Sequence, residues 1–375
     1  MRIGLLLLLT GCKHDDLFRV AGYEQDEFTN NADILFVIDN SGSMVEENQA
    51  LIDNLGVFID QLASDTGTSS SDGLVDAVGN YIEFSGRGTR FVNFNIGVTS
   101  TDVEAHYGAL FGSDPLVTFG DEDVVTAFTE AVSAAATTAG SGNEEGLEAV
   151  FMAMCRAVEE PPEPCYDEID QFTEADELSN EGLIRERGAL IPIIVSDEGD
   201  VSRRRDSQLE GAPDDEPDEY DALFSLFGKR MGWAVIGPTP GVCEGATPVP
   251  DWTADRYHWL VDRTDGFWVD INTGAPECDV TDFADALEEI GELINRLLDS
   301  FPLQAVPDPD TIRVFVDGRL VDRATGDGAG GWGSGWSYDP DSNSIVFHGN
   351  AIPGYGAEVA IYYLPVSGEP RDLPF

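Results

Sequence analysis

The sequence predicts a doubly wound α/β domain with a mostly parallel sheet, followed by a small all-β module. Three observations support this fold class. From about residue 30 to residue 300, continuous apolar runs typical of doubly buried strands alternate with segments of helical apolar spacing. After residue 310 the apolar runs alternate with polar residues and are separated by loops rich in Gly, Asp, Asn and Pro. The length of 375 residues agrees with one large domain and a smaller one.

Residues 1–12 are expected to be a signal segment. Arg2 precedes a short apolar run that ends in Leu9-Thr10-Gly11-Cys12, which resembles the bacterial lipobox, in which the cysteine is lipidated. The resemblance implies export and a lipid anchor on Cys12, and Lys13 after it favours the outer membrane. An ordinary secretory signal and a buried strand are the alternatives. The polar residues 13–30 are expected to form a tether.

The first half of the α/β domain begins with a strand at residues 33–38. Apolar residues at helical spacing predict a helix over 44–63, and the Ser-, Gly- and Asp-rich stretch 64–90 reads as a surface insertion. A second strand is expected from Phe91 to Thr99, and a helix over 143–158.

The second half continues the alternation of strands and helices. Residues 190–195 are a strongly apolar run, although Pro192 weakens the assignment to a central strand. The remaining predicted elements are a helix at 218–230, strands at 233–236 and 266–271, and an amphipathic helix at 283–297.

The predicted domain boundaries follow from this pattern. The α/β domain covers 31–300, a proline-containing linker covers 301–310, and the β module covers 311–375. Within the module, the alternating segment 311–316 ends in Asp317-Gly318, which is a strong hairpin signal. Further strands are expected at 344–347 and 357–363.

The charge of the chain restricts its partners. Asp and Glu number 71 against 20 Lys and Arg, which gives a formal net charge of −51. Nucleic acids and anionic membrane surfaces are therefore excluded as main partners, because both require clustered basic residues. Cations or a basic partner are favoured instead. An acidic surface is equally typical of a protein adapted to a salty environment.

Four cysteines remain after Cys12, an even number that suits an oxidising compartment. Four cysteines allow three pairings, and we favour Cys155–Cys165 and Cys243–Cys278 because each pair brackets an insertion rich in Pro or Gly. A zinc site is the less favoured alternative because the chain lacks a C-x-x-C motif.

Residues with carboxylate or hydroxyl side chains follow two of the predicted buried strands. Asp39, Ser41 and Ser43 alternate along the loop after the first strand, so their three oxygens can turn toward one point. Asp197 follows the strand that ends at Val195 and would face Asp39 if the two strands were neighbours. Hard cations such as Mg²⁺ prefer such oxygen ligands. The alternative is that Asp39 and Ser41 only cap the following helix.

The segment from Asp33 to Met44 resembles the metal-ion-dependent adhesion site of von Willebrand factor type A domains, whose first loop is Asp-x-Ser-x-Ser. The resemblance implies that Asp197 is a second acidic ligand. The family also uses a Thr in a Gly-rich loop before a helix. Ser141 takes that position here, with Asn143 or Glu144 as substitutes. Mg²⁺ is the metal implied, with Ca²⁺ and Mn²⁺ as alternatives.

The amino-acid sequences at three strand ends, residues 37–44, 96–102 and 195–198, also resemble those of exported von Willebrand factor type A lipoproteins of myxobacterial type. This resemblance implies a cell-envelope protein that captures a carboxylate-bearing protein or other ligand through the metal, and not an enzyme. The alternatives are a metal-dependent enzyme or enzyme subunit, and a structural envelope protein whose metal only stabilises the fold. The common hydrolase motifs H-E-x-x-H and G-x-S-x-G do not occur in the sequence.

Overall fold

The computed structural model describes residues 31–63, 92–138, 140, 142–166, 172–185, 188–204, 216–239, 251–272, 280–303, 305–326, 333–340, 343–353, 357 and 359–366. These residues form two compact units that divide between Leu298 and Asp299. None of the helices in the described part of the chain is both long and apolar enough to cross a membrane.

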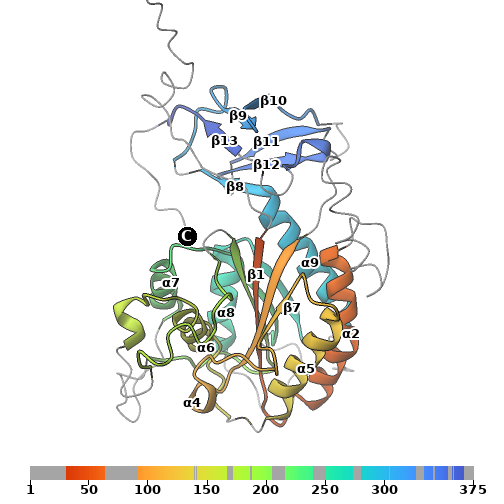
Figure 1. The fold of residues 1–375 in the computed structure, drawn as a ribbon, viewed down its shortest axis with the longest axis vertical. Helices are drawn as coiled ribbons and strands as arrows, with labels where there is room; N and C mark the ends of the chain where they lie inside the picture. The colour runs from red at the N-terminus through yellow and green to blue at the C-terminus, as the bar shows by residue number, and fades with distance from the viewer. Residues whose placement is uncertain are drawn as a thin grey trace, which may run out of the picture. The chain divides into compact units, whose positions relative to one another are not determined.

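The first unit contains a mostly parallel sheet with the strand order β3-β2-β1-β4-β6-β7, and β5 also pairs with β4 (Figure 1). Only β3 runs antiparallel to its neighbour among these described strands. The doubly wound fold class predicted from the sequence is thereby confirmed. The strands are β1 (Asn31–Ile38), β2 (Asn93–Ser100), β3 (Leu116–Thr118), β4 (Ala189–Val195), β5 (Arg230–Met231), β6 (Ala234–Gly237) and β7 (Phe267–Asp270).

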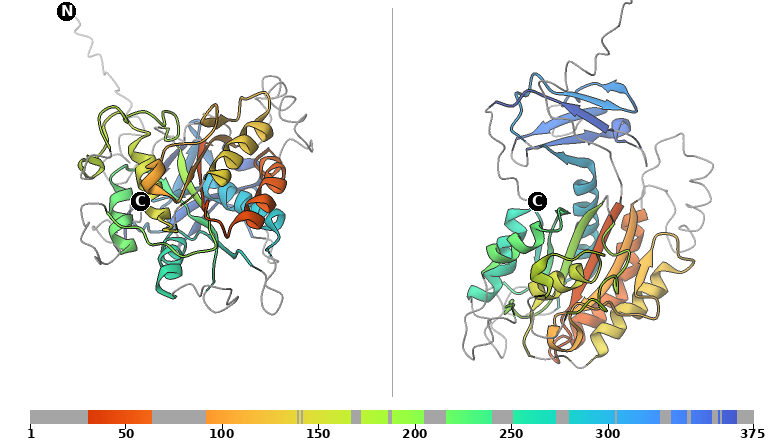
Figure 2. Two further views of the ribbon diagram at one scale, coloured as in Figure 1. Left: turned by 90° about the horizontal axis from the view of Figure 1, so that it is seen from below. Right: turned by 60° about the vertical axis from the view of Figure 1, so that its left-hand side comes forward.

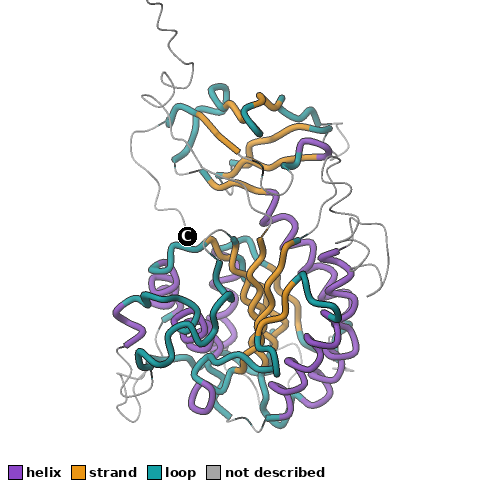
Figure 3. Tube along the Cα trace, in the orientation of Figure 1, coloured by secondary structure: helices purple, strands orange, loops and turns teal. Residues whose placement is uncertain are grey.

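Helices cover both faces of this sheet (Figures 2 and 3). One face packs against α2 (Val45–Ala63), α5 (Val124–Thr137) and α9 (Phe283–Asp299) in one apolar cluster. The other face packs against α6 (Gly146–Cys155), α7 (Pro217–Ser225) and α8 (Asp251–Arg263) in a second cluster. β1 is fully buried from Ala32 to Ile38, and its residues there are apolar except Asp33, which forms an ion pair with Arg185. The short helices α4 (Val103–His106) and η2 (Glu163–Tyr166) complete the unit.

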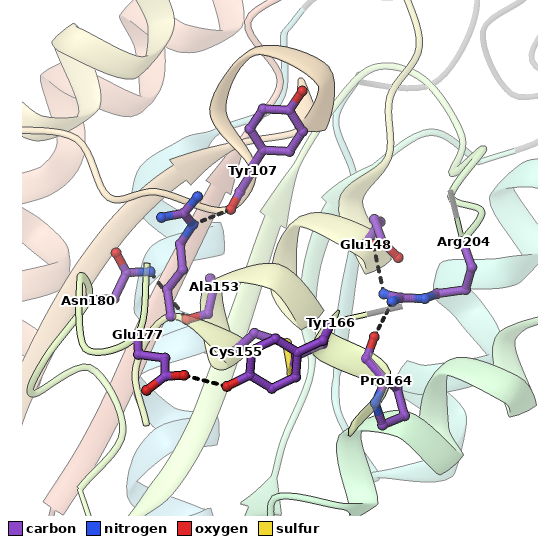
Figure 4. The surroundings of a disulfide bond; sticks show 11 residues. Tyr107, Glu148, Ala153, Cys155, Pro164, Tyr166, Glu177, Asn180 and Arg204 are labelled. Carbon is purple, nitrogen blue, oxygen red and sulfur yellow. Dashed lines mark hydrogen bonds and ion pairs between the residues drawn. A yellow bond between two sulfur atoms is a disulfide. The ribbon is translucent and has the colours of Figure 1, made fainter. Parts of the chain in front are cut away.

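A disulfide joins Cys155 at the end of α6 to Cys165 in η2, ten residues away. This is the pairing favoured from the sequence. Both cysteines are fully buried, and Tyr166 and the Arg204 guanidinium lie around the bond (Figure 4). Arg204 donates to Glu148 at 2.9 Å and stacks over the ring of Phe151. The other predicted disulfide partners, Cys243 and Cys278, lie outside the described residues, as does Cys12.

The second unit contains two antiparallel three-stranded sheets, ordered β10-β9-β13 and β11-β12-β8. One apolar cluster contains residues from both sheets. The predicted Asp317-Gly318 turn joins β9 to β10, and both turn residues have the positive φ (50° and 70°) that a tight hairpin requires. The elements are β8 (Ser300–Pro302), β9 (Arg313–Val316), β10 (Arg319–Val321), β11 (Gly335–Asp339), β12 (Ser344–His348), η4 (Gly349–Ala351) and β13 (Val359–Tyr362).

The stretch 301–310, expected as a linker, is partly structured inside this second unit. β8 begins directly after α9 and pairs with β12. Phe301, Leu303 and Ala305 are buried in the apolar cluster of the unit. The prolines favoured a spacer, but the apolar side chains beside them are buried instead.

Candidate metal centre

Asp39 is fixed at the carboxyl end of the central strand β1. Its backbone N–H donates to the Val195 carbonyl at 2.9 Å, so the loop continues the parallel pairing of β1 and β4. Its carboxylate accepts hydrogen bonds from the Ser41 N–H at 2.8 Å and from the Ser196 hydroxyl at 2.7 Å. The side chain is fully buried. Since neither donor belongs to α2, these bonds do not match the alternative in which Asp39 caps that helix.

A chain of hydroxyls runs from the first loop to Asp197. The Ser41 and Ser43 hydroxyl oxygens are 2.9 Å apart, and Ser43 donates to Asp197 Oδ1 at 3.1 Å. Asp197 lies beside this loop because Ile38 pairs with Val195 in adjacent parallel strands. The structure therefore brings together four of the five predicted site residues. The fifth, Ser141, lies outside the described residues.

The third loop contributes a different oxygen from the one expected. The Glu144 side chain is 1% exposed, and its carboxyl lies against that of Asp39. Glu144 Oε2 accepts a short hydrogen bond from the Thr101 hydroxyl. Glu144 Oε1 is buried and has no hydrogen-bond donor among the described residues. Asn143, the other substitute considered for Ser141, is exposed.

Backbone and side-chain contacts hold this loop from two sides. The Glu145 N–H donates to the Thr101 carbonyl at 3.1 Å, at the end of β2. The Val201 N–H donates to the Glu144 carbonyl at 2.9 Å, in the loop after β4. Two strand-end loops therefore set the position of the Glu144 side chain.

A buried ion pair that was not predicted from the sequence supports this loop. Asp200 accepts from the Leu147 N–H at 3.1 Å, at the start of α6, and from Arg256 of α8 at 2.7 Å. Ser202 accepts from the Glu148 N–H at 2.9 Å. The loop after β4 thus caps α6, although the partners are more than 50 residues apart in sequence. The position of Asp200 three residues after Asp197 is the only signal for it in the sequence.

Burial and the charge of Asp39 raise the pKa values of the carboxyl groups around it. Burial, followed by the charge of Asp39, raises the pKa of Glu144 to about 9 and that of Asp197 to about 6. The same two causes raise the pKa of Glu198. Burial also raises the pKa values of Asp39 and Glu47. The site therefore concentrates negative charge that a bound cation would offset.

The donor atoms of the site fit a hard divalent cation. They are carboxylate oxygens of Asp39, Asp197 and Glu144 and hydroxyl oxygens of Ser41 and Ser43, which suit Mg²⁺, Ca²⁺ or Mn²⁺. Among the described residues, no three or more His, Cys, Asp or Glu side chains gather tightly enough to hold a metal by themselves. Serine hydroxyls would therefore have to complete the ligand set, and the buried Glu144 Oε1 is an oxygen still without a partner there.

Comparison with known proteins gives matches at the level of structure only. No protein-family model and no curated protein sequence matches the chain. The pilus adhesin SpaC of Lactobacillus rhamnosus GG, in its open conformation, is 12% identical with a TM-score of 0.38, over 90% of this chain and 39% of that one. A von Willebrand factor type A protein from Catenulispora acidiphila is 11% identical with a TM-score of 0.37, over 92% of this chain and 62% of that one.

The human COPII-coat protein Sec24c is also similar, at 11% identity and a TM-score of 0.38, over 93% of this chain and 42% of that one. This chain therefore spans less than two thirds of the length of these three structures. Neither function nor partner follows from similarity at this level.

Proposed function

We propose that this chain is a binding protein that captures its ligand through a divalent cation held at the carboxyl ends of β1 and β4. The observation that carries the proposal is the continuous set of oxygens from Asp39 through Ser41 and Ser43 to Asp197. Carboxyl ends of adjacent parallel strands are where open α/β sheets bind ligands. We assign no catalytic residue to the site.

Asp39 and the two serines have different roles in the proposed site. Asp39, held by Ser41 and Ser196, supplies a fixed, buried negative charge for the cation. Ser41 and Ser43 supply neutral oxygens on the solvent-accessible side. Mg²⁺ is the first candidate, and a bound cation supplies an electrophilic centre with exchangeable positions. A carboxylate of a partner protein or other ligand is the group that would occupy such a position.

The proposed setting is the bacterial cell envelope, with a lipid anchor on Cys12 and the outer membrane as the favoured location. The buried Cys155–Cys165 disulfide supports an oxidising compartment outside the cytoplasm. Because the whole chain is so acidic, a partner with basic residues beside its carboxylate suits it better than an acidic partner.

Thermal denaturation of the full chain tests the cation. The melting temperature is measured in chelator and then with Mg²⁺, Ca²⁺ or Mn²⁺. At about a hundredfold excess over Kd, the cation should add about 2.7 kcal/mol to the free energy of unfolding. Asp39→Asn should abolish the rise, whereas Asp53→Asn, on the exposed side of α2, should retain it. No rise in the wild-type chain, or an equal rise in Asp39→Asn, would refute the proposal.

Ligand capture needs a separate experiment. A synthetic peptide with one Glu between lysines serves as the probe, and the same peptide with Gln is its control. The Glu peptide should bind the wild-type chain only when the cation is present, and chelator should release it. If the cation stabilises the chain but neither peptide binds in a cation-dependent way, the cation has a purely structural role.

A further inference from the structure

The third loop places a carboxylate where the resemblance implied a hydroxyl. Glu144 is almost completely buried, and its carboxyl lies against that of Asp39. Glu144 Oε1 is buried, and it accepts no hydrogen bond from the described residues. A cation in contact with both carboxyl groups would give that oxygen a partner and, once Glu144 has lost its proton, offset the negative charge of both groups.

The surroundings keep Glu144 in this position. Thr101 engages Oε2, and the loop backbone is bonded to the ends of β2 and β4. Behind the loop, Gly146 lies so close to Tyr257 that an added Cβ would be 2.3 Å from the phenolic oxygen. The Tyr257 hydroxyl is itself buried without a described partner. Glu144 therefore has little room to turn toward solvent.

We propose that Glu144 is a direct ligand of the cation and completes the site together with Asp39, Ser41, Ser43 and Asp197. This inference rests on the proposed function, because it requires that the site binds a cation. The carboxylates of Asp39 and Glu144 together balance the double charge of the ion even before that of Asp197 is counted. The site then binds cations more tightly than a site with one carboxylate, since ligand charge tunes affinity.

The carboxylates of Asp39 and Glu144 also restrict the class of partner that the bound ion can attract. An ion whose charge is already balanced attracts a free carboxylate weakly, and Asp197 and Glu198 add further negative charge nearby. The ligand therefore has to bring positive charge with its oxygen. We infer a polypeptide whose carboxylate is flanked by lysine or arginine, rather than an isolated organic acid.

The number of water molecules on the ion distinguishes a direct ligand from a nearby charge. Eu³⁺ is used as a luminescent substitute for the cation in the full chain, and its lifetime is compared in H₂O and D₂O. Glu144→Ala should add at least about one coordinated water to the ion, because its oxygen leaves the ligand shell. Glu198→Ala is the matched control, because it removes one charge from the same cluster, and it should add none.

Cation affinity gives a second, independent measurement by calorimetry with Mg²⁺ and Ca²⁺. Glu144→Gln retains the shape and an acceptor for Thr101, and it should weaken binding by at least about tenfold. Glu198→Gln should weaken it by less than about threefold, as expected for a half-exposed charge. If Glu144→Ala does not fold, the affinities of the two Gln variants decide the question.

The outcomes separate this inference from the proposed function. A wild-type chain that binds no cation overturns both. A wild-type chain that binds a cation, with a water count and an affinity unchanged by loss of Glu144, overturns only the role of Glu144. If Glu144→Gln and Glu198→Gln weaken cation binding equally and the number of coordinated waters does not change, Glu144 acts only as a nearby charge and not as a direct ligand.

Discussion

Close contact between Gly146 and Tyr257 sets a strict size limit at the start of α6. An added Cβ would lie 2.3 Å from the Tyr257 hydroxyl oxygen, inside a fully buried region. Gly146→Ala should therefore destabilise the chain by about 1–3 kcal/mol in urea denaturation. Gly142→Ala is the control, because no atom lies within 4 Å of its added Cβ. Equal effects of the two variants would contradict this steric explanation.

The raised pKa values predict how the metal-free chain responds to pH. The folded pKa values of Glu144 (about 9) and Asp197 (about 6) exceed their ordinary values of 4.5 and 3.8, so the folded state binds protons more tightly than the unfolded state. Their contribution to stability is present at low pH and is lost as pH rises through these two values. In chelator, the melting temperature should therefore fall from pH 6 to about pH 9.5. A profile that stays flat, or one that Glu144→Gln leaves unchanged, would contradict this.

The candidate site was predictable where its residues share one short segment. Asp39, Ser41 and Ser43 lie within five residues after a buried strand, and the pairing of β1 with β4 explains why Asp197 joins them. Glu144 was only one of two substitutes for Ser141. Its buried position against Asp39 depends on Thr101 and on the loop after β4, and neither contact is visible in the local sequence.

At the scale of elements, long apolar runs predicted the buried strands, and the pairing of β4 explains how a proline fits into one of them. Pro192 argued against a central strand, yet it lies within β4. β4 pairs with β5 at Ala189 and Leu190 and with β6 from Ile193 onward. Pro192 therefore falls between these two partners on that side, where its missing N–H interrupts no pairing with β5 or β6.

Helices whose buried face includes small or charged side chains were harder to predict than the buried strands. Neither α5 nor α8 was predicted. In α5 the buried positions, among them Val124, Phe128 and Ala135, follow helical spacing, so the sequence does carry a signal for this helix. In α8 the buried face includes Arg256, which is 5% exposed. A buried arginine depends on its partner Asp200, 56 residues earlier, so local patterning does not predict it.

The Asp200–Arg256 pair links α8 to the start of α6, and we expect it to be sensitive to removal of one partner. Arg256→Met leaves the fully buried Asp200 without its cation and should cost about 3–5 kcal/mol in urea denaturation. The double variant with Asp200→Asn should recover part of this loss, because it removes the unpaired charge. A double variant as unstable as Arg256→Met would show that packing of the arginine, not its charge, matters.

At the scale of the whole molecule, net charge dominates the response to salt. With a formal charge of −51, the folded chain repels itself, and salt screens that repulsion. The melting temperature in chelator should therefore rise by several degrees between about 20 mM and 1 M KCl. At the upper concentration the Debye length is only about 3 Å, so the surface charges are screened from one another. Chelator keeps divalent cations from contributing. A melting temperature that is constant or falls with salt would contradict self-repulsion as a limit on stability.

The pairing of β1 with β4 also has a consequence for the order in which the chain folds. Ser43 and Asp197 meet across a separation of 154 residues, so the site forms only after a very long loop has closed. A cation has no assembled set of oxygens to bind until both central strands are paired. If the site binds a cation as proposed, the stabilising effect of that cation belongs to the last stage of folding and slows the first opening of the sheet rather than speeding its formation.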